Sequence, residues 1–359
     1  MNHESIESII RSKFLIQDKL LRDDGLIEFK VEQNQSLKEN FKDVVTRLKE
    51  LGGTAILRKD NDDLIIYVTQ SHKVTKFNSR TPIILFIATI ATVSIDGYFR
   101  VANIPGVNIF SITLLYTLSL LGILGVHELG HKVASSRHGI KSSFPYFIPG
   151  LPTFLPTFGA VIKSGEPPVN RDSLFDLGIS GPLAGLVVTI FVAIGGAFTA
   201  ISMPERDVAR RVSEGSMSEL SQMDIFTSLI VKNLIPQVEG MEIILSPLSF
   251  AASLGFLVTF LNLLPAWQLD GGHIARAALS ETRHRILTWI TITIMFILGY
   301  GLMALLVLFF SLRAPEMTLL DNVSDLSNGR KITFILVLIL AGVLYYFTIM
   351  NNPFFFPSE

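Results

Sequence analysis

Residues 113–131 read Thr113-Leu-Leu-Tyr-Thr-Leu-Ser-Leu-Leu-Gly-Ile-Leu-Gly-Val-His-Glu-Leu-Gly-His131. Up to Val126 the run holds no charged side chain, which is typical of a helix that crosses the ~30 Å hydrocarbon layer of a membrane. Three ionisable side chains then follow, His127, Glu128 and His131. A charge at bilayer depth costs roughly 2.5–3.5 kcal/mol on insertion scales, so such groups persist where they face a metal, a partner or a cavity. The stretch predicts a membrane helix that ends in a chemical site.

The composition of the whole chain also indicates a membrane protein. Hydrophobic residues make up 49% of the 359 residues and charged residues only 17%, against about 25% charged in soluble domains. Several apolar runs approach the ~20 residues that a spanning helix needs. We predict an α-helical polytopic membrane protein with about six transmembrane helices, at residues 81–98, 108–134, 174–202, 243–266, 285–311 and 332–350.

Basic residues indicate how these spans are oriented. Lys132 and Arg137 follow the second span, and Arg276 and Arg283 follow the fourth. Because Lys and Arg collect in cytoplasmic loops, six crossings would place both the N- and C-termini in the cytoplasm. The N-terminal segment is charged and resembles neither a signal peptide nor an organellar transit peptide, which favours the prokaryotic plasma membrane.

Residues 1–80 differ from the rest because they are charge-rich and contain no run that could span a bilayer. We expect a strand near 26–31, a helix after the capping box Ser36-Leu-Lys-Glu39, and a hairpin formed by 55–58 and 64–68. These elements predict a small soluble cytoplasmic α+β domain with a regulatory or docking role. The division of the chain is then 1–80 for this domain, 81–350 for the transmembrane domain and 351–359 for a short tail.

Residues 144–168 do not fit a membrane helix. Six prolines interrupt an aromatic-rich stretch there, and each proline removes a backbone donor that a lipid-exposed helix needs. We expect a membrane-associated loop or short hairpin that is buried against protein.

Charge and cysteine content exclude several classes of function. The formal net charge is −1 and no stripe of Arg or Lys with interleaved aromatics is present, so no nucleic-acid partner is expected. The chain has no cysteine, which excludes disulfides, thiolate catalysis and thiolate metal ligands. Any metal site must therefore use His and carboxylate ligands.

The pattern His127-Glu128-Leu-Gly-His131 has the spacing of a zinc site. On a helix, side chains at positions i and i+4 share one face, so both imidazoles can reach one ion. Glu128 can then address a water molecule at the metal as general base. The alternative is a polar cap without metal, where the helix reaches the membrane interface.

A third ligand is expected in the stretch Asn262-Leu-Leu-Pro-Ala-Trp-Gln-Leu-Asp-Gly-Gly-His273. The proline and the paired glycines would end the preceding apolar helix, and Asp270 at the break could turn toward the metal. The competing interpretation is a surface turn in which Asp270 caps a helix. His273 is either a hydrogen-bonding neighbour of the site or an interfacial residue.

Together the two motifs, HExxH in one membrane helix and Asn-x-x-Pro-x-x-x-x-Asp-Gly in a later one, resemble the site-2 protease family of intramembrane zinc metalloproteases. The resemblance covers about 108–280, the expected catalytic core. It implies one zinc ion per chain held by His127, His131 and Asp270, with Glu128 activating the water. Asn262 would contact substrate backbone or a reaction intermediate, although a helix–helix hydrogen bond is an equal alternative.

We therefore expect an intramembrane zinc metalloendopeptidase that hydrolyses peptide bonds of transmembrane protein substrates within or near the lipid bilayer, in regulated intramembrane proteolysis. The alternatives are a polytopic transporter or a catalytically inactive membrane scaffold. A transporter predicts ionisable residues scattered over several spans, and an inactive scaffold predicts loss of a ligand or of the glutamate. The substrate and the oligomeric state are not predictable from the sequence.

Overall fold

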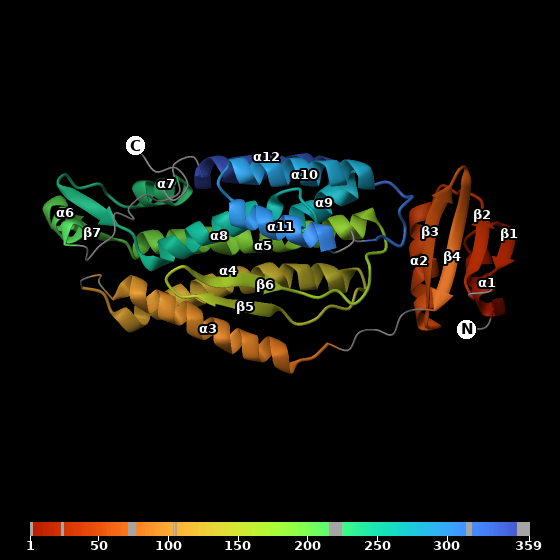
Figure 1. Ribbon diagram of the computed structural model, residues 1–359, viewed down its shortest axis with the longest axis horizontal. Coiled ribbons are helices and arrows are strands. Elements are labelled where there is room, and N and C mark those ends of the chain that lie inside the picture. Colours follow the sequence, from red (N-terminus) through yellow and green to blue (C-terminus); the bar gives the residue numbers. More distant parts are fainter. Residues whose placement is uncertain are drawn as a thin grey trace.

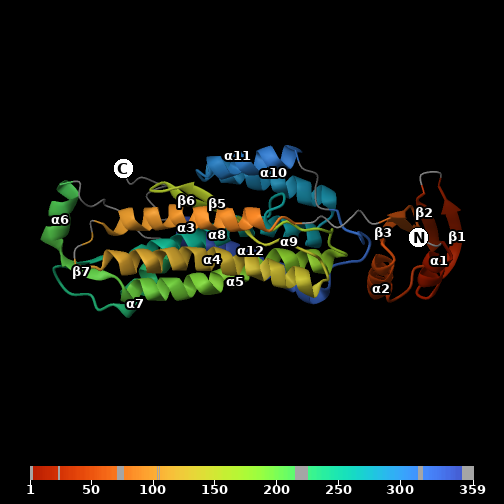
Figure 2. The same cartoon turned by 90° about the horizontal axis from the view of Figure 1, so that it is seen from below.

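The computed structural model describes residues 3–22, 25–70, 77–102, 104, 106–214, 225–313 and 318–349. It contains a small N-terminal unit beyond one end of an elongated layer of helices (Figures 1 and 2). The predicted tail, 351–359, lies outside the described residues. In chain order the elements are α1 (His3–Arg11), β1 (Ile16–Leu21), β2 (Ile27–Val31), α2 (Leu37–Glu50), β3 (Gly53–Asp60), β4 (Asp63–Gln70), α3 (Arg80–Val101), α4 (Ile109–Arg137), β5 (Tyr146–Leu151), β6 (Leu155–Val161), α5 (Arg171–Phe198), β7 (Ile201–Pro204), α6 (Glu205–Ser213), α7 (Ile225–Leu234), β8 (Met241–Ile244), α8 (Pro247–Leu263), α9 (Asp270–Ala278), α10 (Glu281–Ile297), α11 (Gly301–Arg313) and α12 (Asn328–Ile349).

The N-terminal unit is an antiparallel sheet of order β1-β2-β4-β3 with α1 and α2 packed against it. Strands β2, β3 and β4 alternate buried and partly exposed side chains, as expected of a sheet with one solvated face. The predicted strand, helix and hairpin are confirmed, whereas α1 and β1 were not predicted. The predicted capping box is wrong in detail, because the Ser36 side chain makes no capping hydrogen bond.

Within the described residues, four helices are long and apolar enough to cross a membrane, namely α3, α4, α5 and the first part of α12. The helices α8 and α11 are apolar but shorter, at 17 and 13 residues. The count of about six spans therefore remains a prediction. Helix α5 packs against α4, α8 and α9 and so forms the centre of the layer.

The expected fifth span, 285–311, is not one helix. Helix α10 ends at Ile297, and Gly299 adopts a φ of +84°. The Gly299 N–H donates to the Phe296 carbonyl and the Tyr300 N–H to the Met295 carbonyl, at 3.2 and 2.9 Å. This is the Schellman pattern that ends a helix at glycine. The prediction was wrong because it counted apolar length and overlooked the glycine that stops the helix.

Helices α10 and α11 instead pack against each other as a pair. The backbone N–H of Trp267 donates to the Thr288 hydroxyl in the middle of α10, and the Trp267 ring stacks on Phe310 near the end of α11, with centroids 5.8 Å apart. The chain therefore returns to the end of the layer where α10 began. From there α12 runs to the opposite end, away from the N-terminal unit (Figure 1). This course differs from the predicted one, in which both termini lie on the same side.

The N-terminal unit contacts the helical layer through an isolated parallel β-bridge. The segment before α12 pairs in parallel with the β3 edge, where the Leu57 N–H donates to the Leu320 carbonyl at 2.8 Å. The Arg58 guanidinium donates to the carbonyls of Leu319 and Leu320. Leu320 also enters the hydrophobic core of the unit. These contacts attach the unit at the end of the layer where α5 and α12 begin.

Residues 144–168 contain the antiparallel hairpin β5–β6, which lies along α3 (Figure 1). Gly150 is required there, because a Cβ atom would lie 2.0 Å from the Leu155 carbonyl oxygen. The hairpin exposes large apolar side chains, among them Phe144, Leu151 and Phe154. Across the described ranges, no third strand pairs with β5 or β6.

Candidate metal centre

The two histidines of the HExxH motif lie one turn apart on α4, with their Nε2 atoms 3.1 Å from each other. Asp270 begins α9, after the chain has left α8 at Leu263 and passed Pro265. Its carboxylate oxygens lie 3.1 Å from His127 Nε2 and 3.2 Å from His131 Nε2. The structure thus brings together the three side chains that the two motifs contribute. The Asp270 side chain faces the imidazoles, and no capping bond starts α9.

Three glycines of α5 create the room for this arrangement. A Cβ atom on Gly181 would lie 2.1 Å from His131 Nε2, and one on Gly185 would lie 3.2 Å from the His127 Cβ. A Cβ atom on Gly178 would lie 2.7 Å from the Asp270 carbonyl oxygen. The spacing of three and four residues puts these glycines on one helix face. That face allows α5 to approach both α4 and α9 closely.

A backbone carbonyl orients one of the imidazoles. His131 Nδ1 lies 2.8 Å from the carbonyl oxygen of Leu177, which can only accept, so Nδ1 carries the proton. His131 Nε2 then keeps its lone pair and points toward His127 and Asp270. Histidine ligands in metal sites are commonly held in this way.

The two imidazole nitrogens and the two oxygens of the Asp270 carboxylate fit the ligand shell of a single zinc ion. Tetrahedral bonds of 2.0–2.1 Å require ligand atoms about 3.3 Å apart, and the observed separations are 3.1–3.2 Å. Two imidazoles and one carboxylate are also a ligand set that zinc enzymes use, with a fourth position left for water.

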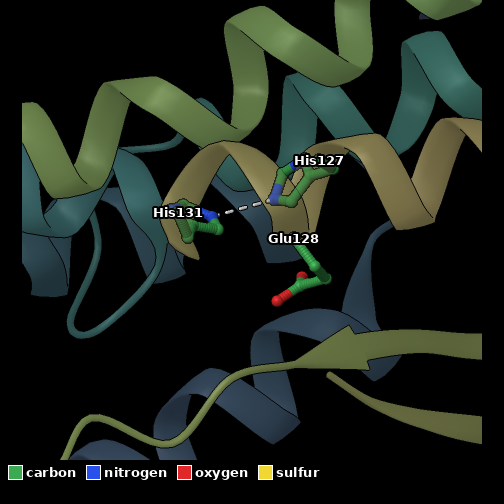
Figure 3. Close-up of side chains that lie close together, drawn as sticks. All are labelled: His127, Glu128 and His131. Carbon is green, nitrogen blue, oxygen red and sulfur yellow. Dashed lines mark hydrogen bonds between the residues drawn. The ribbon is translucent and has the colours of Figure 1, made fainter. Parts of the chain in front are cut away.

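Glu128 lies beside these atoms but points elsewhere. Figure 3 shows its carboxylate turned away from both imidazoles, toward the strands of the β5–β6 hairpin. The possible ligand atoms of His127, Glu128 and His131 all lie within 4.8 Å of one another. Glu128 is 5% exposed, and its carboxylate has no hydrogen bond or ion pair with any residue that the structure describes. A carboxylate in this position, without a partner among the described residues, is available to a group from outside the chain.

Asn262 and His273 are less decisively placed. Asn262 lies in the last turn of α8, is half-buried, and its side chain makes no hydrogen bond among the described residues. The alternative of a helix–helix hydrogen bond is thus not seen there. His273 is half-buried on α9, with its Cβ close to Gly178 of α5.

Two features of the site were not predicted. The roles of Gly178 and Gly185 depend on which helix crosses α4, and the spacing of small residues was the only signal in the sequence. Trp267 adopts a φ of +44°, which is unusual for a non-glycine residue. The chain at this point links α8 to α9, so the strained residue lies in the segment that carries Asp270 into place.

Comparison with known proteins identifies the family. The sequence profile of peptidase family M50 matches residues 115–306, more than half of the chain. The chain belongs to peptidase family M50. The resemblance to the site-2 protease family is thereby confirmed, and the matched region contains both motifs of the candidate metal centre.

Curated relatives from Arabidopsis thaliana carry zinc metalloprotease names. The probable zinc metalloprotease EGY2, chloroplastic, is 30% identical over 230 residues, which cover 61% of this chain and 39% of that protein. The probable zinc metalloprotease EGY1, chloroplastic, is 29% identical over 229 residues, which cover 62% of this chain and 40% of that protein. The chain thus spans about two fifths of the length of these relatives. No solved structure matches the chain.

Proposed function

We propose that this member of family M50 is an intramembrane zinc metalloendopeptidase in which His127, His131 and Asp270 hold one zinc ion per chain. The observation that carries the proposal is the convergence of two imidazole nitrogens and a carboxylate within 3.1–3.2 Å. They lie beside an unpaired glutamate in a layer of apolar helices. The substrates would be transmembrane proteins, cleaved within or near the bilayer as part of regulated intramembrane proteolysis.

Zinc, when bound, supplies a Lewis acid that polarises a peptide carbonyl and makes water more acidic. Glu128 takes a proton from the attacking water while the water oxygen bonds to the carbonyl carbon. Glu128 then delivers this proton to the amide nitrogen as the carbon–nitrogen bond breaks. The buried, unpaired position of its carboxylate suits a group that must exchange protons with a substrate.

In this proposal, the β5–β6 hairpin and Asn262 bind the substrate. A helical substrate must unwind before its carbonyls can be attacked, and the extended segment then needs partners for its backbone groups at membrane depth. The β5–β6 hairpin can provide them by accepting an added strand. The amide of Asn262, which makes no hydrogen bond among the described residues, can donate to a substrate carbonyl.

The membrane placement follows from the ends of the helices. The HExxH end of α4, the start of α5 and the N-terminal unit lie together, and Lys132, Arg137 and Arg171 cluster at this end. The positive-inside rule therefore assigns it to the cytoplasmic face. A prokaryotic plasma membrane is the simplest location, with the N-terminal unit as a cytoplasmic regulatory or docking domain.

A transporter or an inactive scaffold is less well supported. In the described helices of the layer, charged residues other than the candidate centre lie near helix ends. A transport path would instead place them along several spans. An inactive scaffold would have lost a ligand or the glutamate, and all four side chains are present.

The test measures zinc content and proteolysis together on detergent-purified full-length protein, with a generic transmembrane substrate. Wild type is compared with Glu128→Gln and Asp270→Ala, and with the surface variant Asp325→Ala as control. We expect about one zinc per chain and cleavage in wild type and control. Glu128→Gln should keep the metal and lose at least about 100-fold in kcat. Asp270→Ala should bind zinc poorly. Wild type that takes up no zinc when the metal is supplied would refute the proposal.

A further inference from the structure

Asp96 is a fully buried carboxylate near the C-terminal end of α3, away from the candidate centre. It is on α3, a candidate membrane span. Removing the partner of a buried charge costs roughly 3–5 kcal/mol. The partners of Asp96 therefore indicate what the residue is for.

Donors from three elements converge on this carboxylate. Arg100, one turn further along α3, donates from Nε and Nη2 at 2.7 and 3.3 Å, and the Tyr116 hydroxyl of α4 donates at 2.5 Å. The remaining donor is the backbone N–H of Thr153, at 2.8 Å. Arg100 is also held by α8, because its guanidinium lies over the Phe250 ring at 3.6 Å.

Thr153 lies in the turn of the β5–β6 hairpin, with a φ of +70°. Its backbone N–H would have no partner within the hairpin, and an unpaired N–H in hydrocarbon costs several kcal/mol. Asp96 supplies that partner. One turn earlier on α3, the Thr92 hydroxyl donates to the Pro156 carbonyl at 2.8 Å. Two residues on one face of α3 thus hold both sides of the hairpin turn.

The other end of the hairpin is tied to the catalytic helix. Lys132, next to His131, donates to the carbonyl of Ser143 at 3.0 Å. Phe147 of β5 packs against α4 near Gly125, one turn before Glu128. The hairpin is therefore fixed at both ends, beside the side chain proposed as general base.

We propose that Asp96 is a positioning residue that holds the hairpin turn and thereby sets which peptide bond of an added substrate strand faces Glu128. The inference rests on the proposed function, because it assumes that the hairpin binds substrate. A strand that slips by one residue presents its opposite face. Release of the turn should therefore change the cleavage position and the KM more than the kcat.

The experiment uses Asp96→Asn, Thr92→Val and a matched control, Ser94→Ala. Ser94 is on the same helix, and its hydroxyl lies near Thr117 of α4 without touching the hairpin. Because the chain has no cysteine, Phe154→Cys at the turn accepts a single nitroxide label whose mobility is read by electron paramagnetic resonance. Cleavage positions are mapped by mass spectrometry, and zinc content is measured on each variant.

We expect faster label motion, additional cleavage positions and a KM raised about tenfold in Asp96→Asn, the size expected for loss of a charge-assisted hydrogen bond. Zinc content should be unchanged. Thr92→Val, which keeps the charged network, should show the same changes at smaller size, and Ser94→Ala none. Unchanged label motion in both Asp96→Asn and Thr92→Val would overturn the anchor. Faster motion with unchanged cleavage positions and KM would overturn the positioning role. Failure of the proposed function would appear in wild type itself, as absent zinc or absent cleavage.

Discussion

Asp96 on α3 and Glu128 on α4 both place a carboxylate inside the helical layer, at 0% and 5% exposure. Asp96 accepts hydrogen bonds from Arg100, Tyr116 and the hairpin turn. Glu128 accepts none from the residues that the structure describes. The same chemical group is thus fully satisfied at one place and left open at the other, within one pair of packed helices.

The comparison of Asp96 with Glu128 distinguishes two roles of a buried charge. A carboxylate whose donors all come from the protein holds elements together, because its cost of burial is offset only in the folded arrangement. A carboxylate without protein donors is available to a group from outside the chain, which is the role proposed for Glu128. Asp270 is intermediate, since its partners are two imidazoles that it shares with a candidate ion.

The largest expected effect contrasts Asp270→Asn with Asp96→Asn. Both substitutions remove one buried negative charge with little change in shape. Loss of the Asp270 carboxylate should weaken zinc binding by more than the roughly 10–100-fold that follows loss of a ligand's hydrogen-bond partner, whereas Asp96→Asn should leave zinc affinity unchanged. Competition with a fluorescent zinc chelator measures both. Equal zinc affinities in the two variants would mean that Asp270 does not hold the metal.

A second effect tests whether the room around the centre matters. Gly181→Ala puts a Cβ atom where His131 Nε2 now lies, at 2.1 Å, whereas a Cβ on Gly195 of the same helix meets only Leu248, at 3.9 Å. Gly181→Ala should displace the imidazole and lower zinc affinity roughly 10–100-fold. Gly195→Ala should keep wild-type zinc affinity and change the free energy of unfolding by under about 1 kcal/mol. Equal zinc affinities in Gly181→Ala and Gly195→Ala would show that α5 shifts to accommodate the added methyl group without displacing His131.

The candidate centre was predictable because its chemistry is local. The i, i+4 spacing brings His127 and His131 together on any helix, and Pro265 with the glycines after Asp270 marks a helix end. The glycine face of α5 was not predictable in the same way. Gly178 and Gly185 act on side chains of α4 and α9, and nothing in the α5 sequence states which helices cross it.

Long-range contacts account for the remaining differences. The β-bridge between Leu57 of β3 and Asp321 joins residues more than 250 positions apart, so no local sequence pattern predicts it. The break between α10 and α11 had a signal, Gly299 followed by Gly301, but apolar length outweighed it. The hydrogen-bond network at Asp96 was predictable only in part. The spacing of four residues indicates the pair with Arg100, whereas Tyr116 and Thr153 belong to other elements of the fold.

The smallest expected effect tests Asp96, the carboxylate whose donors all come from the protein, without removing its charge. Tyr116→Phe deletes one donor to Asp96 and leaves Arg100 and the Thr153 N–H in place. We expect the free energy of unfolding to fall by about 1–2 kcal/mol, between the value for hydrogen bonds to charged groups and the lower average in membrane proteins. Zinc content and kcat should be retained, because this donor touches neither the metal centre nor Glu128.

The control is Tyr98→Phe, at an exposed tyrosine on α3, which should change the free energy of unfolding by under about 0.5 kcal/mol. Unfolding in mixed micelles measures both. If Tyr116→Phe lost zinc while its stability stayed at the wild-type value, the two carboxylates would be coupled, and the separation between a charge that holds the fold and one that serves the reaction would fail.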